Sequence, residues 1–226
     1  MTALDELLAG NQTFQSTYEK YAEKIAAQTE PLKKIAVLSC IDARVNPIRI
    51  FHLNIGDLII LRNAGNLITE DVVRSLMVAI TAGITEIVIL GHTDCKMTKI
   101  TREKVRDAIQ KLGGTLDPVT FLRFNEWLGT FSNEELNIGE QVTLLRTYST
   151  IPPQLIIHGL LYDIGTGALK VVVNGYETSK PAKVKVSSMG LTLNMPSLNM
   201  PSINMLPMTI GQLFANLKKE RLNPSK

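Results

Sequence analysis

The sequence has few of the features that mark secreted or membrane proteins. It contains two cysteines in 226 residues, Cys40 and Cys95, which cannot form the disulfide framework of a small extracellular domain. No apolar run approaches the roughly 18 residues that a membrane-crossing helix needs. The first residues also lack the basic start and long apolar stretch of a secretory signal. We therefore expect a cytoplasmic protein without a transmembrane segment.

Aromatic residues are scarce, at 5% of the chain, and the net charge of +3 is unevenly distributed. Residues 179–226 contain seven basic residues and one acidic residue, whereas residues 1–178 contain 17 basic and 20 acidic residues. Proteins that bind nucleic acids usually cluster their basic side chains and place aromatic side chains among them. Neither pattern is present, so we expect no nucleic-acid partner.

Composition divides the chain into a domain at 1–178 and an extension at 179–226. The extension is rich in Pro, Met and Ser and carries a five-residue repeat, LNMPS-LNMPS-INMLP, at 193–207. Its regularly spaced prolines exclude a continuous helix, so we interpret the repeat as a linker. The following residues, 208–222, combine a capping-box pattern with one apolar stripe, which predicts a terminal amphipathic helix.

Short runs that are apolar at nearly every position alternate with amphipathic segments in the first domain. Such runs are typical of strands covered on both faces, and their alternation with helices favours a parallel sheet. We expect an α/β fold with a mainly parallel central sheet of four strands plus an edge strand, flanked by helices, with an N-terminal helix and a C-terminal extension. The four strands should end near residues 40, 63, 92 and 164, the edge strand should span 168–174, and helices should cover 3–27, 69–83, 98–112, 118–128 and 132–148.

Polar or metal-binding residues stand at the ends of three predicted strands. Cys40, Asn63 and His92 each close an apolar run. Ligands of open parallel sheets bind outside the carboxyl ends of the strands. The sequence therefore predicts a functional site at this edge of the sheet.

The stretch ILGHTDCKM at 89–97 places His92 three positions before Cys95. This spacing alone fits a core histidine beside an inert thiol, a redox pair with Cys40, or half of a metal site. Together with Cys40 it offers two thiolates and one imidazole, which suit zinc with a fourth position for water or another ligand. Asp42 and Arg44 follow Cys40 at alternate positions, where a carboxylate and a guanidinium can pair bidentately.

These motifs, C-x-D-x-R at 40–44 and H-x-x-C at 92–95, resemble the signature of the β-class carbonic anhydrases. The segments RNAGNLITEDVVRSLMVAI, EIVILGHTDC and HGLLYDIGTGALK resemble the small archaeal and bacterial branch of that family, in the same order. The resemblance covers most of residues 4–175 and does not extend to residues 179–226. It implies a zinc enzyme that reversibly hydrates CO2 to bicarbonate and a proton, and a homodimer or larger homo-oligomer in which the N-terminal helix packs on the partner.

The resemblance also implies roles for individual residues. Cys40, His92 and Cys95 would bind one Zn²⁺ per subunit, and Asp42 and Arg44 would form the catalytic dyad. In some members of the family the aspartate becomes the fourth zinc ligand in a closed state, which Asp42 could also do. The backbone of Ala64 and Gly65 would border the substrate pocket, although a tight turn explains this glycine equally well.

One position departs from the resemblance. The branch usually has glycine directly after the second cysteine, where this chain has Lys96. If the position requires a positive φ angle, lysine would cost on the order of 1 kcal/mol. A cation there could also stabilise the neighbouring thiolate. We favour a simpler interpretation, in which Lys96 faces solvent.

Two other functions compete with CO2 hydration. Members of the same branch hydrolyse CS2 or COS with the same motif, and a zinc-binding scaffold protein without catalysis would keep the three ligands but would not need Asp42 and Arg44. The segment at 208–222 resembles peptides that direct enzymes into encapsulin or microcompartment shells. It could instead dock on its own oligomer or contact a membrane surface through Lys218, Lys219 and Arg221.

Overall fold

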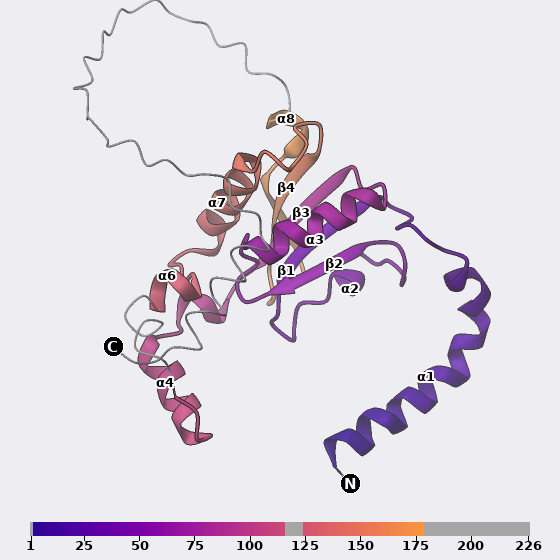
Figure 1. Ribbon diagram of the computed structural model, residues 1–226, viewed down its shortest axis with the longest axis horizontal. Helices are drawn as coiled ribbons and strands as arrows, with labels where there is room; N and C mark the ends of the chain where they lie inside the picture. Colours follow the sequence, from indigo (N-terminus) through magenta and orange to yellow (C-terminus); the bar gives the residue numbers. More distant parts are fainter. Residues whose placement is uncertain (1, 116–123, 179–226) are drawn as a thin grey trace, which may run out of the picture. The chain divides into compact units, whose positions relative to one another are not determined.

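A computed structural model of the chain describes residues 2–115 and 124–178 (Figure 1). The predicted linker at 193–207 and the predicted helix at 208–222 lie outside the described residues, as does the first part of the helix expected at 118–128. The division at residue 178 and the shell-targeting function of the extension therefore stay predictions.

A five-stranded sheet forms the centre of the domain, in the order β2-β1-β3-β4-β5. The first four strands are parallel, and the last pairs antiparallel with its neighbour across the turn at 163–167. This arrangement confirms the predicted α/β fold with its antiparallel edge strand. The strands are β1 (Ile35–Cys40), β2 (Ile59–Asn63), β3 (Glu86–His92), β4 (Ile156–Tyr162) and β5 (Leu169–Val173).

Both faces of the central strands are covered, as their continuous apolar sequences predict. Alternate residues of β1 and β3 lie on one face of the sheet with side chains from α3 (Glu70–Thr81) and α7 (Glu134–Thr147). The opposite face packs against the segment around α2 (Pro47–Ile50). Every residue of β3 after Glu86 is buried, so the last residue of this strand delivers its side chain into a site shielded from water.

The remaining helices correspond to the amphipathic segments of the sequence. They are α1 (Ala3–Ala26), the 3₁₀ helix η1 (Lys96–Thr98), α4 (Arg102–Lys111), α6 (Phe124–Leu128) and α8 (Gly175–Thr178). The helix expected at 98–112 begins only at Arg102, because Thr101 caps its first turn and η1 occupies the preceding residues. In the described part of the chain, no helix is both long enough and apolar enough to cross a membrane.

Residues 3–17 of the first helix are all exposed. A capping box between Thr2 and Asp5 begins α1, as hydrogen bonds from each backbone N–H to the other side chain show. Its apolar residues have large exposed fractions: 64% for Leu4, 73% for Leu7 and 55% for Leu8. The described residues of the chain therefore do not cover these leucines.

Candidate metal centre

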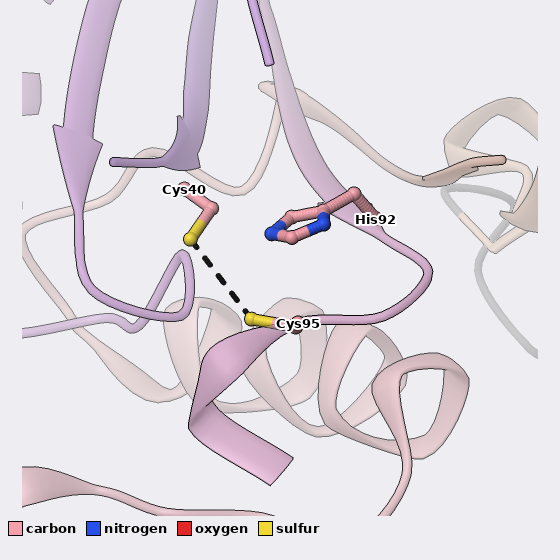
Figure 2. Close-up of side chains that lie close together, drawn as sticks. All are labelled: Cys40, His92 and Cys95. Carbon is pink, nitrogen blue, oxygen red and sulfur yellow. Dashed lines mark hydrogen bonds between the residues drawn. The ribbon is translucent and has the colours of Figure 1, made fainter. Parts of the chain in front are cut away.

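Three side chains able to bind a metal converge at the carboxyl ends of β1 and β3. Cys40 ends β1, His92 ends β3, and Cys95 follows three residues later (Figure 2). All three are buried, and their ligand atoms lie within 4.8 Å of one another. The two sulfur atoms are 4.0 Å apart. The structure thus brings together the residues that the sequence places at separate strand ends.

A left-handed residue makes this convergence possible. β1 and β3 are adjacent parallel strands, so Cys40 and His92 end at the same edge of the sheet. Asp94 then adopts a φ of 55°, which reverses the chain and returns Cys95 toward Cys40. Aspartate is one of the few residues other than glycine that tolerate this conformation. Cys95 in turn occupies the N-cap position of η1.

The imidazole of His92 has one occupied and one free nitrogen. Nδ1 lies 2.9 Å from the carbonyl oxygen of Thr93, so this nitrogen carries the proton and donates. Nε2 is buried without a hydrogen-bond partner in the described residues. Metal-binding histidines are usually oriented in this way, by a hydrogen bond from the other ring nitrogen. The orphaned Nε2 beside two sulfur atoms fits a zinc ion.

The two thiols cannot readily ionise together without a cation. Their mutual contact lowers the pKa of Cys40, aided by His92, and raises the pKa of Cys95. Burial opposes protonation of His92, but the neighbouring Cys40 sulfur and the hydrogen bond to the Thr93 carbonyl outweigh burial and raise the pKa of the imidazole. The sulfur pair therefore favours one thiolate, and a divalent cation would stabilise the second.

A bidentate ion pair lies at the mouth of the centre. Arg44 donates from Nε to Oδ1 of Asp42 at 2.9 Å and from Nη2 to Oδ2 at 2.7 Å. These hydrogen bonds hold the pKa of Asp42 well below its usual range. Arg62 of β2 donates to the carbonyl oxygens of Cys40 and Asp42, at 3.0 and 2.7 Å, and so fixes the backbone beneath the pair.

The metal centre opens into a pocket of about 620 Å³. The polar part of its lining includes Asp42, Arg44 and Asp94, and the remainder is largely apolar. An apolar lining of this kind accepts a small, nonpolar molecule, because no polar group of the lining loses a hydrogen-bond partner when the molecule enters. The apolar lining residues are Ile41, Ala43, Ala64, Met97, Ile100, Val105 and Leu128.

The structure separates the two residues expected to border this pocket. Ala64 lines it, whereas Gly65 is not among the lining residues. The amide nitrogen of Gly65 lies 3.5 Å from Sγ of Cys40 and donates to it from behind. Its φ of 82° and the closeness of Phe131 and Met97, 3.0 and 3.1 Å from where a Cβ would stand, leave no room for a side chain. Gly65 thus supports the sulfur atom, and its expected place at the border of the substrate pocket stays a prediction.

Lys96 has no positive φ angle, so the strain considered for this position does not arise. The left-handed residue of the loop is Asp94, two positions earlier. Lys96 begins η1, is exposed, and lines the pocket. Its ammonium group therefore contributes positive charge near the pocket mouth while remaining in contact with solvent, which agrees with the solvent-facing interpretation.

Sequence reasoning missed the residues of α7 that support the centre. Glu134 accepts a hydrogen bond from the amide of Cys95 at 3.1 Å. Asn137 donates to the carbonyl of Gly65 at 3.2 Å, and Gln141 joins Asn137 to the amide of Ile68. The signal was present as polar residues at 134, 137 and 141, spaced by three and four along one helix face among apolar residues.

Comparisons with known proteins agree with this site. The sequence profile of the carbonic anhydrase family matches residues 35–169. The chain is 29% identical to β-carbonic anhydrase 1 of Mycobacterium bovis over 176 residues, covering 76% of this chain and 99% of that protein. It is 30% identical to a carbon disulfide hydrolase of Acidianus sp. over 185 residues, covering 72% and 89%.

A solved structure shows the same arrangement of the chain. The crystal structure of β-carbonic anhydrase isoform I from Trichomonas vaginalis superposes with a TM-score of 0.68 at 29% identity. The match covers 78% of this chain and all of that one. The chain therefore belongs to the β-class carbonic anhydrase family.

Proposed function

We propose that the protein catalyses the reversible hydration of CO2 to bicarbonate and a proton, with one zinc ion per subunit bound by Cys40, His92 and Cys95. One observation carries the proposal: a buried Cys-His-Cys cluster with an orphaned imidazole nitrogen lies beside an ionised Asp–Arg pair. Zinc at such a site lowers the pKa of water to about 7 and so supplies a nucleophile at neutral pH.

The residues of the pocket have separate roles in the proposed reaction. Asp42, kept ionised by Arg44, can only accept hydrogen bonds, so it orients a donor between itself and the metal position. Arg44 holds this carboxylate in a fixed direction by two parallel hydrogen bonds. The apolar lining admits the nonpolar substrate. Bicarbonate, being charged, gains little from such walls and leaves toward solvent. Held by Arg44, Asp42 has the orientation proposed for the open site, in which it does not bind the metal. Its approach to the metal as a fourth ligand stays a prediction.

A CO2 hydration assay with zinc analysis tests the proposal. The purified zinc-loaded protein should hydrate CO2, and Asp42→Ala should keep its zinc while turnover falls about 100-fold or more. Asp71→Ala is the matched control, because Asp71 pairs with Arg74 on the exposed surface of α3, outside the pocket lining. Absence of hydration by the zinc-loaded protein, or full turnover in Asp42→Ala, would contradict the proposal.

The same assay separates the competing functions. Release of sulfide from CS2 or COS, without CO2 hydration, would identify a hydrolase of the kind named among the relatives. Zinc binding without either activity would identify a scaffold protein. The ordered Asp42–Arg44 pair favours an enzyme over a scaffold, because neither side chain is needed to hold a structural metal.

We also propose that the protein forms a homodimer or larger homo-oligomer through α1. The exposed leucines of this helix support the proposal, since single solvated helices seldom display a row of large apolar side chains. Leu7→Glu combined with Leu8→Glu should shift the mass measured by light scattering toward the monomer. An unchanged mass would show that α1 does not hold the subunits together.

A further inference from the structure

Arg44 contacts a second carboxylate that the proposed reaction leaves without a role. Besides its two hydrogen bonds to Asp42, Arg44 donates from Nη1 to Oδ2 of Asp94 at 3.0 Å. Nη2 also donates to the backbone carbonyl of Asp94 at 3.2 Å. Two aspartates thus hold adjacent edges of the guanidinium, and one of them lies outside the C-x-D-x-R motif.

Asp94 connects two segments that are otherwise separate in sequence. Asp42 and Arg44 belong to the turn after β1, whereas Asp94 stands between His92 and Cys95. Lys99 binds the other oxygen of the Asp94 carboxylate. The resulting chain of alternating charges runs from Asp42 through Arg44 and Asp94 to Lys99, so neither carboxylate faces an unbalanced like charge.

A turn residue alone would not need this charge. Aspartate is common at positive φ, so Asp94 could serve only to reverse the chain. Asparagine serves equally well in that conformation, and Asn66 of this protein does so with a φ of 51°. An asparagine at 94 would keep the turn but could offer Arg44 only a neutral oxygen. The two roles therefore predict different behaviour for Asp94→Asn.

We infer that Asp94 is a positioning residue: it fixes Arg44, and through Arg44 the carboxylate of Asp42, relative to the loop that carries His92 and Cys95. The effect of Asp94 on catalysis rests on the proposed function. The hydrogen bonds by which Asp94 holds Arg44, which we call the clamp, are present whatever the function is. Four of the five N–H donors of the guanidinium are engaged, and they come from all three nitrogens, so Arg44 has little freedom to rotate.

Chemical modification tests the clamp without measuring activity. Phenylglyoxal, which reacts with accessible arginine side chains, is added to the full-length protein, and peptide mass spectrometry gives the rate at each arginine. Asp94→Asn and Asp94→Gly should raise the rate at Arg44 about threefold or more and leave Arg74 unchanged. Asp71→Asn weakens a comparable exposed Asp–Arg pair, so it should raise the modification rate at Arg74 and leave the rate at Arg44 unchanged. An unchanged rate at Arg44 in both Asp94 variants would overturn the inference.

Kinetics of the same variants test the consequence for catalysis. For CO2 hydration, kcat and kcat/KM should fall together by about tenfold in Asp94→Asn, with KM unchanged, because only the aim of Asp42 is altered. Glycine also tolerates a positive φ angle but offers Arg44 no side-chain oxygen, so kcat should fall further in Asp94→Gly than in Asp94→Asn. Full turnover in Asp94→Asn would overturn the inference even if modification of Arg44 rises. If the unaltered protein does not hydrate CO2, the proposed function is wrong. The modification rates at Arg44 would still test whether Asp94 fixes this side chain.

Discussion

Two histidines on neighbouring strands have opposite surroundings. His92 ends β3, and its Nε2 is buried without a partner. His158 lies within β4, donates from Nε2 to Glu86 at 3.2 Å and accepts at Nδ1 from the amide of Gly175 at 3.1 Å. Tyr176 packs edge-on against its ring, with centroids 4.8 Å apart. A histidine with both nitrogens satisfied stabilises the fold, whereas a buried nitrogen left free is available to a metal.

Position along the strands accounts for the contrast. His158 pairs in register with Val88, in the interior of β3, and its partner Glu86 begins that strand. His92 stands at the carboxyl end, where the chain turns into the loop of Cys95. The two hydrogen bonds of His158 are those of a structural residue inside the sheet. The comparison can be tested by removing each ring in turn.

The largest expected effect is the loss of metal from His92→Ala. Removing one of three proposed protein ligands should weaken zinc binding at least about 100-fold, because even residues that merely orient ligands contribute 10-fold to 100-fold. Zinc analysis after dialysis measures this, with His158→Ala as the matched control. His158→Ala should retain zinc but lose about 1–3 kcal/mol of unfolding free energy in urea, since it removes the hydrogen bonds of the ring with Glu86 and with the Gly175 amide. Stoichiometric zinc in His92→Ala would refute the assignment.

Metal removal should distinguish the two sites in the same way. A ligand present at about 1,000 times its Kd stabilises the folded state by about 4 kcal/mol, so a chelator should lower the Tm of the unaltered protein clearly. The same chelator should leave the Tm of His92→Ala unchanged. In His158→Ala the chelator should lower the Tm by as much as in the unaltered protein, although the Tm before treatment should already be lower. Equal responses in all three proteins would show that the metal is not bound at His92.

A smaller effect is expected behind the metal centre, at Asn137. Asn137→Leu would remove the hydrogen-bond donor to the Gly65 carbonyl and the acceptor for Nε2 of Gln141, at a cost of about 1–3 kcal/mol. Urea unfolding measures this cost. Thr143→Ala is the control on the same helix, because its hydroxyl is exposed and bonds only within the helix. If both variants lose the same stability, the buried amides do not support the Gly65 turn.

The sequence predicted strand order in the chain, burial of β1 and β3, and the edge at which the site lies, because all three follow from local apolar runs. It could not predict that Gly65 would lie behind Cys40 or that Asp94 would reach Arg44. Both facts depend on how loops from different strands meet in space. The polar residues Glu134, Asn137 and Gln141 were visible as a spaced set, but their partners are backbone groups, which no residue pattern reveals.

The smallest expected effect concerns Tyr176, beside the satisfied histidine. Its hydroxyl donates to Oε1 of Glu86 at 2.8 Å, and this hydrogen bond raises the pKa of Tyr176 above its usual value of 10.0. Because the folded-state pKa is raised, the stabilisation is fully present below pH 10 and is lost as the pH rises through the folded-state value.

Tyr176→Phe should therefore be less stable than the unaltered protein at pH 8, and the difference should shrink above pH 10 as the hydroxyl ionises beside Glu86. Urea unfolding at both pH values measures the two differences. A difference that stays constant across this range would mean that the hydrogen bond to Glu86 does not account for what the Tyr176 hydroxyl contributes to stability. Zinc content should be the same in both proteins at either pH, because Tyr176 lies in α8 beside His158, whose two ring nitrogens are both hydrogen-bonded.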